Sequence, residues 1–208
     1  MPSPPDRSVE FPCGESPFRM KGLVYGAAKE CYDETIRGGV DAVLALIDSA
    51  PLRVFFSQTF LPGAWYDALP IVRISAVAAR AAGKTHAALV RGNAAWVAAR
   101  DVRGVYKFLL QLASAEMVAQ RLARVSMQYF DFGGADGKMI RDKVLESHRF
   151  GIPAPMAQWF IHAAEGFTPV ALELTGARDV RVRSSTPKPE GEVSGMTTMR
   201  IRFEVSWT

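Results

Sequence analysis

Apolar side chains recur at intervals of three and four positions through most of the first 130 residues, which is the spacing of a helix with one buried face. This spacing predicts helices within residues 19–36, 40–47, 66–82, 84–102, 105–113 and 114–130. Gly38, Gly39 and Gly83 break the pattern, and Pro51 is predicted to end the second helix, because the residue before a proline disfavours helical geometry. Ser114 stands where a capping hydroxyl is expected. The first part of the chain is therefore predicted to be helical.

The pattern changes from residue 139 onward. Residues 139–150 lack helical spacing and are predicted to form a strand, whereas 178–183 and 199–207 alternate between apolar and charged side chains, as half-buried strands do. The stretch 184–195, rich in Pro, Gly, Ser and Glu, is predicted to be a long hairpin loop. Residues 154–176 carry the apolar stripe of a helix that packs on a sheet. The predicted fold class is α+β, with an N-terminal helical half followed by strand, helix, strand and strand in an antiparallel sheet.

Length and composition favour one domain with a flexible start. At 208 residues and 49% apolar content, the chain can bury one sizeable core. Residues 1–17 hold five prolines and no sustained period, so we interpret 1–18 as a flexible Pro-rich arm and 19–208 as a single domain. The arm lacks the features of a secretory signal, and no stretch reaches the roughly 18 apolar residues of a membrane span. A cytoplasmic location is the resulting expectation.

The distribution of charge argues against nucleic-acid binding. The chain has 25 Lys and Arg against 21 Asp and Glu, without a run of five like charges, and its aromatic residues do not interleave with basic ones. The two predicted terminal strands nevertheless carry a stripe of arginines on their outer side: Arg181, Arg183, Arg200 and Arg202. An outward charged stripe is usually the solvated side of a sheet, and the alternative is a cationic surface that meets a partner.

Reactive side chains do not form a recognisable catalytic or metal-binding motif. The three histidines, His86, His148 and His162, lie far apart in the sequence, and we interpret them as structural or surface residues. No His, Cys, Asp or Glu residues have the spacing of a metal site, and both cysteines are interpreted as ordinary thiols. The glycines within 133–137 precede a strand, whereas a phosphate loop follows one, so we interpret them as a turn. The sequence predicts neither an enzyme nor a metalloprotein.

Several short motifs occur in an order that is typical of a known fold. Met20-Lys21-Gly22 opens a helix, and Ala164-Glu165-Gly166 lies in the helix that precedes the terminal pair of strands. This arrangement resembles the heme-nitric oxide/oxygen-binding (H-NOX) fold and its vinyl-4-reductase-like relatives. Trp65 and the terminal Val205–Trp207 are also similar to a heme-free myxobacterial paralogous family of unknown function. The resemblance spans residues 19–207 and implies the H-NOX architecture.

Two features of the heme-binding members are absent at the similar positions. Those members hold the iron through a histidine on the helix before the first strand, and the similar stretch 114–130 contains none. They also hold the heme propionates with a Tyr-x-Ser-x-Arg motif, and the strand here reads Leu145-Glu146-Ser147-His148-Arg149, which keeps Ser and Arg but not Tyr. Without the axial ligand, the chain cannot position a heme iron in the family's manner. The resemblance therefore implies a domain without heme.

The relatives without heme imply two other uses of the cavity between helices and sheet. One is to bind an apolar small molecule or a fatty acyl chain, and the other is to serve as an interaction domain for a signalling partner or in a homodimer. We assign ligand binding to Trp96, Phe108, Leu122, Tyr129, Ser147 and Arg149. An arginine fork suits a carboxylate or phosphate head group, and the alternative is that Arg149 pairs with an acidic neighbour.

The expected function is accordingly a heme-free, non-enzymatic ligand-binding or sensory domain. The alternative from another class is a structural or scaffolding module that fills its own core, with Trp65, Trp96, Phe108 and Tyr129 inside it. A third alternative is a heme-based gas sensor, which requires an iron ligand that the sequence does not offer at the similar position.

Overall fold

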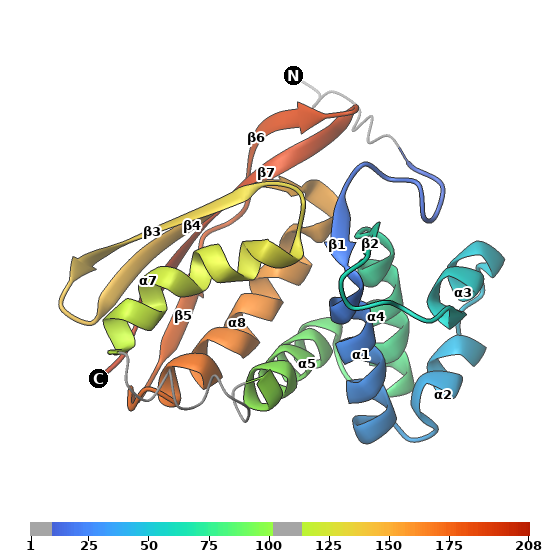
Figure 1. The fold of residues 1–208 in the computed structure, drawn as a ribbon, viewed down its shortest axis with the longest axis horizontal. Helices are drawn as coiled ribbons and strands as arrows, with labels where there is room; N and C mark the ends of the chain where they lie inside the picture. The colour runs from blue at the N-terminus through green and yellow to red at the C-terminus, as the bar shows by residue number, and fades with distance from the viewer. Residues whose placement is uncertain (1–9, 102–113) are drawn as a thin grey trace.

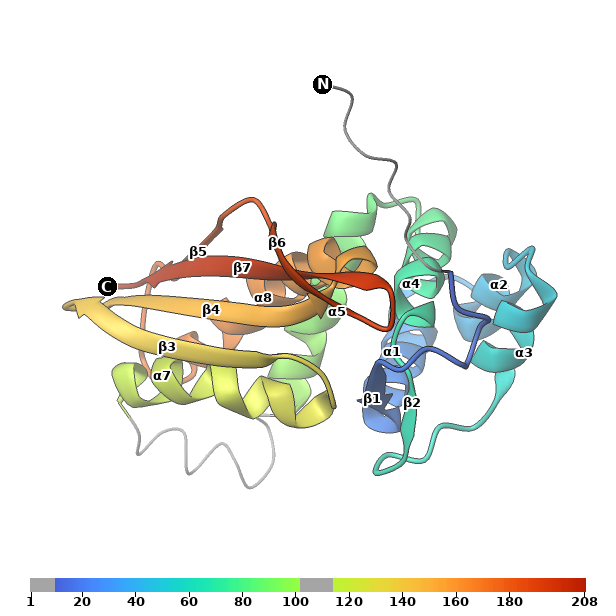
Figure 2. The same ribbon diagram turned by 90° about the horizontal axis from the view of Figure 1, so that it is seen from above.

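The structure, a computed structural model, describes residues 10–101 and 114–208 and has two parts that lie side by side (Figure 1). The first part is a group of helices, and the second is a sheet with two helices on it. Figure 2 shows the same division from above. The two parts meet where α5 (His86–Asp101) packs against α8 (Ala157–Glu173). The α+β fold class predicted from the sequence is confirmed.

The helical part contains the helices predicted within 19–36, 40–47, 66–82 and 84–102, and it has a further helix at Pro51. Residues 10–101 form α1 (Gly22–Thr35), α2 (Gly39–Ala45), α3 (Ala50–Ser57), α4 (Pro70–Ala81) and α5. The breaks at Gly38 and Gly83 are confirmed, and both have positive φ angles, 82° and 62°, which other residues rarely adopt. Pro51 lies in the first turn of α3 and does not end a helix. A proline is tolerated there because the backbone N–H groups of the first turn have no hydrogen-bond partner within the helix.

Two short strands connect the segment before α1 with the segment before α4. β1 (Arg19–Lys21) pairs antiparallel with β2 (Trp65–Asp67), although helical spacing had placed residues 19–21 in the first helix. Gly22 follows β1 and begins α1, and a Cβ atom there would lie 2.2 Å from the carbonyl oxygen of Leu61. The close approach of the two backbones therefore requires a glycine at this position.

Residues 10–18 are packed on the domain, and the prediction that they belong to a flexible arm is wrong for this stretch. The carboxylate of buried Asp67 accepts hydrogen bonds from the N–H groups of Gly14 (2.9 Å) and Ser16 (3.2 Å) and from the Ser16 hydroxyl. Phe18 is buried and meets the ring of Phe132 edge to face, with centroids 5.5 Å apart. This carboxylate satisfies backbone donors that a loop would otherwise leave to water.

The second part is built on an antiparallel sheet with the strand order β3-β4-β7-β5, and β6 pairs with the other end of β7. The strands are β3 (Gly134–Arg141), β4 (Val144–Pro153), β5 (Arg181–Ser184), β6 (Lys188–Val193) and β7 (Met196–Ser206). The strict alternation predicted for the last strand is confirmed, because Ile201, Phe203 and Val205 are buried while Arg200 and Arg202 are exposed.

The sheet has two strands more than the predicted order of strand, helix, strand and strand. The predicted single strand over 139–150 is a hairpin of β3 and β4, which also absorbs most of the glycine-rich stretch interpreted as a turn. The chain reverses at Asp142-Lys143, and Lys143 has a φ of 53°. The predicted loop 184–195 contains β6, whose side chains are all exposed. Backbone pairing with β4 and β7, rather than side-chain burial, produces both extra strands.

One face of the sheet is covered by α7 (Ala115–Ser126) and α8 (Figures 1 and 2). The predicted cap of α7 is confirmed, because the Ser114 hydroxyl accepts the N–H of Met117 at 3.3 Å. A small apolar cluster forms where the helices meet the strands, and it contains Val118, Ala119, Leu145, Leu172, Ala177, Val205 and Trp207. Of the described helices, none combines the length and apolarity needed to cross a membrane.

Candidate functional site

A small cavity lies between α7, α8 and the inner face of the sheet. Its volume is about 30 Å³, which is room for one or two water molecules. Most of the lining is apolar, and the polar exceptions are Ser147, Arg149 and Thr168. The full lining consists of Ala119, Leu122, Leu145, Ser147, Arg149, Ala164, Thr168, Val182, Phe203 and Val205.

The pleat of β4 decides which side chains reach this cavity. Successive residues of a strand point to opposite faces, so Leu145, Ser147 and Arg149 share the inner face, and the outer face receives Glu146 and His148. The cross-strand neighbours agree, because Ser147 lies opposite buried Phe203 and Arg149 lies opposite buried Ile201. One strand thus places a hydroxyl and a guanidinium group beside apolar walls.

Arg149 is the cation of this site. Burial of its guanidinium group lowers its pKa from the ordinary value to about 10, and the charge of nearby Asp136 acts in the opposite direction. The arginine stays charged at neutral pH, but its charge is held where water screens it poorly. Such a group interacts strongly with an anion that enters the same space.

Ser147 is buried, and its hydroxyl donates a hydrogen bond to the carbonyl oxygen of Asp136 at 2.8 Å. Because the single hydroxyl proton is used in this way, the oxygen of Ser147 is left to accept hydrogen bonds. Asp136 also receives Nδ1 of His148 on its carboxylate at 2.9 Å, on the outer face of the sheet. Asp136 therefore bonds both Ser147 and His148 of β4, and its charge acts on Arg149.

The structure brings together half of the residues assigned to the site from the sequence. Leu122, Ser147 and Arg149 line the cavity. Trp96 does not, because it lies on the side of α5 that faces α1, where its indole N–H donates to Glu34 at 2.8 Å. Tyr129 belongs to the short 3₁₀ helix Met127–Tyr129 after α7 and is not part of the lining, and Phe108 lies outside the described residues.

Sequence reasoning missed the rest of the lining, which consists of small or apolar residues of α7, α8, β4, β5 and β7. Ala119 is three positions before Leu122 on α7, so helical spacing could have added it. Phe203 and Val205 belong to the apolar face predicted for the last strand, and that face alone could have identified them. Ala164 belongs to the apolar stripe predicted for the helix over 154–176, and that stripe could have identified it.

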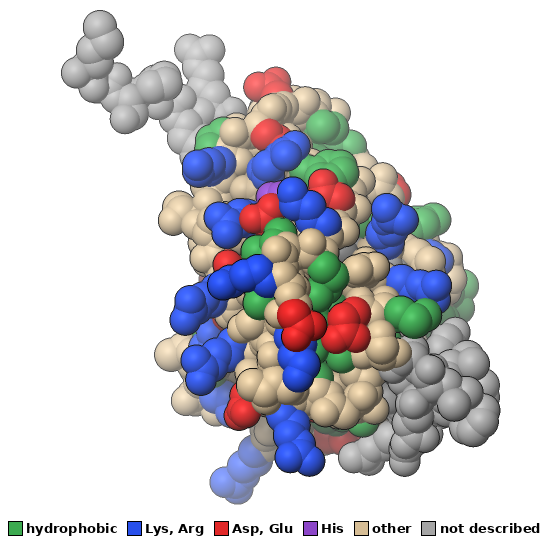
Figure 3. All heavy atoms as spheres, turned by 90° about the vertical axis from the view of Figure 1, so that its left-hand side faces the viewer, with side chains coloured by type: hydrophobic (Ala, Val, Ile, Leu, Met, Phe, Trp, Pro, Cys, Tyr) green, Lys and Arg blue, Asp and Glu red, His purple; other side chains and the backbone are tan. Residues whose placement is uncertain are grey.

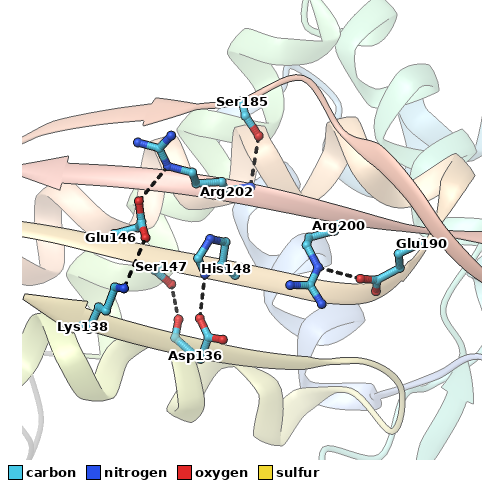
Figure 4. A network of polar contacts seen from close by, with 9 residues as sticks. All are labelled: Asp136, Lys138, Glu146, Ser147, His148, Ser185, Glu190, Arg200 and Arg202. Carbon is cyan, nitrogen blue, oxygen red and sulfur yellow. Dashed lines mark hydrogen bonds and ion pairs between the residues drawn. The ribbon is translucent and has the colours of Figure 1, made fainter. Parts of the chain in front are cut away.

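On the outer face of the sheet, two arginines of the predicted stripe form ion pairs (Figure 4). Nε of Arg202 lies 3.0 Å from Glu146, and Nε of Arg200 lies 2.8 Å from Glu190. Figure 3 shows acidic and basic side chains interspersed over the end of the molecule formed by the sheet. Exposed pairs of this kind contribute little stability each, so the face has the character of a solvated sheet surface.

Two histidines that are far apart in the sequence meet where α4, α5 and α8 join. Nε2 of His86 lies 2.8 Å from the hydroxyl of buried Ser75, and the rings of His86 and His162 lie edge to face with centroids 6.4 Å apart. Nδ1 of His162 lies 3.1 Å from Glu165, which also pairs with Arg91 at 2.8 Å. Within the described residues, no group of three or more His, Cys, Asp or Glu is placed to hold a metal ion.

We expect the thermal stability to fall as the pH is lowered through the range in which His86 titrates. Burial lowers the pKa of His86 below its ordinary 6.5, and the nearby His162 lowers it further. Above pH 6.5 the imidazole is neutral in both the folded and the unfolded chain. As the pH falls below 6.5, the unfolded chain binds the proton before the folded protein does, so stability is lost until the pH has passed the folded-state pKa. Melting temperatures measured from roughly pH 8 to pH 5 check this slope.

The variant His86→Gln provides the matched comparison. Its amide nitrogen can still donate to Ser75, but it does not titrate, so we expect the melting curve to be flatter below neutral pH. Near pH 8, where His86 is neutral, the difference in melting temperature between the variant and the parent protein should not change with pH. An equally steep loss in the variant would assign the pH dependence to another group.

No protein-family model matches this sequence, and no curated protein matches it significantly. Solved H-NOX structures do match its fold. The Fe(II) unliganded H-NOX protein from K. algicida has a TM-score of 0.62 at 10% identity, with 91% of this chain and 97% of that chain covered. A point mutant of that protein has a TM-score of 0.64 at 9% identity with the same coverage. An oxygen-binding H-NOX domain related to soluble guanylate cyclases has a TM-score of 0.57 at 13% identity, over 90% and 92% of the two chains.

The chain therefore has an H-NOX-like fold, and the resemblance inferred from the sequence is confirmed at that level. At such low identity, the similarity concerns the fold and not the ligand. The similarity to the heme-free myxobacterial family stays a prediction.

Proposed function

We propose that this chain is a non-enzymatic, sensor-type ligand-binding domain that takes a small amphipathic molecule with an anionic head group, such as a fatty acyl carboxylate, and uses no heme. The fold supports a sensory role, since the solved structures that share it include an oxygen-binding H-NOX domain. The observation that carries the proposal is Arg149, a poorly solvated cation on the inner face of the sheet at the edge of an apolar cavity.

An anionic head group is the ligand chemistry that this arginine favours. A guanidinium fork donates two parallel hydrogen bonds to a carboxylate, and the pairing offsets the desolvation that lowers the pKa of Arg149. The oxygen of Ser147 can accept a hydrogen bond from a protonated or hydroxylated head group. The apolar walls from α7, α8 and β7 then suit a hydrocarbon portion.

The size of the cavity sets a condition on this function. About 30 Å³ does not accommodate an acyl chain, so binding requires that the helices move away from the sheet. The helices contribute small side chains to the lining, Ala119 from α7 and Ala164 from α8. A ligand would in this way change the position of α7 or α8, which is the kind of response that a sensor transmits.

The residues around the cavity do not fit a heme. None of the three histidines of the chain borders it: His86 and His162 lie at the junction of α4, α5 and α8, and His148 points to the outer face of the sheet. The position of the motif's tyrosine holds Leu145, which packs in the small apolar cluster. The proposed function therefore involves no iron.

The described residues that line the cavity include no pair of nucleophile and base, and this supports the non-enzymatic assignment. Among the described residues, the hydroxyl of Ser75 lies beside His86, but Ser75 is buried away from the cavity. A nucleophile and base need access to a substrate. A cytoplasmic location and a signalling partner belong to the same proposal.

A second candidate, a scaffolding module with a self-filled core, is favoured by the small volume of the cavity. It differs from the ligand-binding domain in one measurable respect. A scaffold needs no occupant, whereas the proposed domain retains one.

Native mass spectrometry with added dodecanoate separates these functions. We expect one dodecanoate per chain, with an affinity roughly tenfold lower in Arg149→Gln, because a charge-assisted pair is lost. Arg183→Gln is the matched control, since Arg183 is exposed on the outer face. Absence of any adduct, or equal binding by both variants, would favour the scaffold.

Reconstitution with hemin tests the part of the proposal that concerns heme. We expect no Soret band of fixed stoichiometry, because no histidine borders the cavity. A saturable band at one heme per chain would contradict the proposal and restore the gas-sensor alternative.

A further inference from the structure

The sheet ends on one side in an unpaired strand. β3 is the outermost strand beside β4, and no described segment forms a ladder with its other edge (Figure 2). α7 lies alongside β3 in Figure 2, and its buried side chains pack against the inner face of the sheet rather than forming a ladder with this edge. An open strand edge presents backbone donors and acceptors that can pair with another strand.

A side-chain hydrogen bond shows which backbone groups face that open edge. The hydroxyl of Ser147 on β4 donates to the carbonyl oxygen of Asp136, so this carbonyl is directed toward β4. Backbone groups of successive strand residues alternate in direction, so those of Ala135, Gly137 and Met139 are directed outward. The pairing of β3 with β4 is regular from Gly134 to Met139, and the register shifts only after that residue.

We propose that this edge pairs antiparallel with the same edge of a second copy of the chain, with the twofold axis at Gly137. In this register Ala135 lies opposite Met139 of the other copy, and Gly137 lies opposite itself. These are the residues whose backbone groups face outward, so the pairs can exchange hydrogen bonds. The two sheets then form one continuous sheet through the dimer.

The charges on β3 favour this register. Asp136 lies opposite Lys138 of the other copy, and the twofold axis produces that contact twice. Both side chains are on the outer face, since Asp136 contacts His148 and Lys138 lies 4.0 Å from Glu146. Each is also the more exposed member of its pair, because the side chain of Asp136 is 58% exposed and that of Lys138 is 74% exposed. Opposite charges directly across an antiparallel pair are stabilising, and like charges are destabilising.

A second copy explains this arrangement better than an unrelated strand. Asp136, Gly137 and Lys138 match an antiparallel copy of the same three residues, because the acid then meets the base on both sides of the glycine. Gly137 is the residue at which the register places the twofold axis. Gly137 has no side chain, so the two backbones can approach at the axis. Ile140, an exposed apolar side chain near the end of β3, lies opposite Gly134 of the other copy.

Two charge-reversed variants test the register. Lys138→Asp places acidic residues opposite each other, and Asp136→Lys places basic residues opposite each other, so we expect each variant alone to dimerise at least about tenfold more weakly. Mixed together, the two variants carry complementary edges and should form a heterodimer. Lys84→Asp, an equal charge change on the exposed turn between α4 and α5, is the control and should dimerise like the parent protein.

Sedimentation equilibrium measures the parent and single variants, and native mass spectrometry with one variant labelled with ¹⁵N identifies the heterodimer. A parent dimer of twice the 22.8 kDa chain mass, loss of dimer in both variants and its return in the mixture would support the proposal. A monomeric parent protein, variants that still dimerise, or a mixture that remains monomeric would overturn it. Recovery in the mixture also shows that neither variant has failed to fold.

Discussion

Gly166→Ala is expected to lower the free energy of unfolding by about 3 kcal/mol, because the added methyl group has no space at the crossing of α8 and α5. A Cβ atom at this position would lie 2.1 Å from the carbonyl oxygen of Arg91 and 2.8 Å from its Cα atom. These are backbone atoms of a neighbouring helix, so a rotamer change cannot relieve the overlap. The two helices must separate along the contact that joins the two parts of the molecule. The measurement is chemical denaturation monitored by circular dichroism.

Gly92→Ala is the matched control for this substitution. Gly92 is an exposed residue of α5, close to Arg91, and a Cβ atom there would meet nothing within 4 Å. Alanine in a helix interior is more favourable than glycine by up to about 1 kcal/mol, so we expect this variant to gain stability. If Gly166→Ala is as stable as the parent protein, the helices are farther apart in solution than in the structure.

The sequence predicted the elements whose stability depends on side-chain burial. The alternation in the last strand identified β7 and both of its faces, because a strand with one buried face requires a period of two. Helical periodicity placed α4 and α5 on either side of Gly83 for the corresponding reason. In these elements the local pattern and the tertiary packing agree.

The elements that the sequence missed depend on partners that are distant in the chain. The first four residues of β3 are Gly134, Ala135, Asp136 and Gly137, and every residue of β6 is exposed, so neither strand has an apolar period. Both form because neighbouring strands supply hydrogen bonds to their backbones. The packing of residues 10–18 depends in the same way on the carboxylate of Asp67, which lies about 50 positions further along the chain. No pattern within residues 10–18 predicts this contact.

The site residues on β4 could be predicted, because the alternation of a strand determines the face of the sheet to which each side chain points. Ser147 and Arg149 were identified through a resemblance, and the alternation of β4 independently places them on one face. Trp96 was misplaced because an alanine-rich helix such as α5 has little contrast between its faces, and its indole is directed to Glu34 on α1. The meeting of His86 and His162 could not be foreseen, since it depends on how α5 and α8 cross.

Arg149→Met is expected to raise the free energy of unfolding of the unliganded protein by about 2 kcal/mol, in contrast to most substitutions at buried positions. The lowering of the pKa of Arg149 to about 10 corresponds to a cost of about 3 kcal/mol for holding the charged form in the folded state. Because the folded-state pKa lies below the unfolded value, this cost is complete at neutral pH and disappears only in strong base. Methionine keeps the apolar stem and removes the charge, and part of the gain is offset by the lost polar contacts of the guanidinium group.

The outcome also decides between the two interpretations of Arg149. An arginine that serves a ligand reduces stability in the ligand's absence, so its replacement stabilises the protein while dodecanoate binding is lost. An arginine that acts structurally, through the charge of Asp136 and its own polar contacts, does the opposite, because its removal takes these interactions from the folded state. Denaturation of Arg149→Met beside Arg183→Met, the exposed control expected to change by less than about 0.5 kcal/mol, measures the sign directly. A loss of stability specific to Arg149→Met would remove the main support for a ligand site at this end of the sheet.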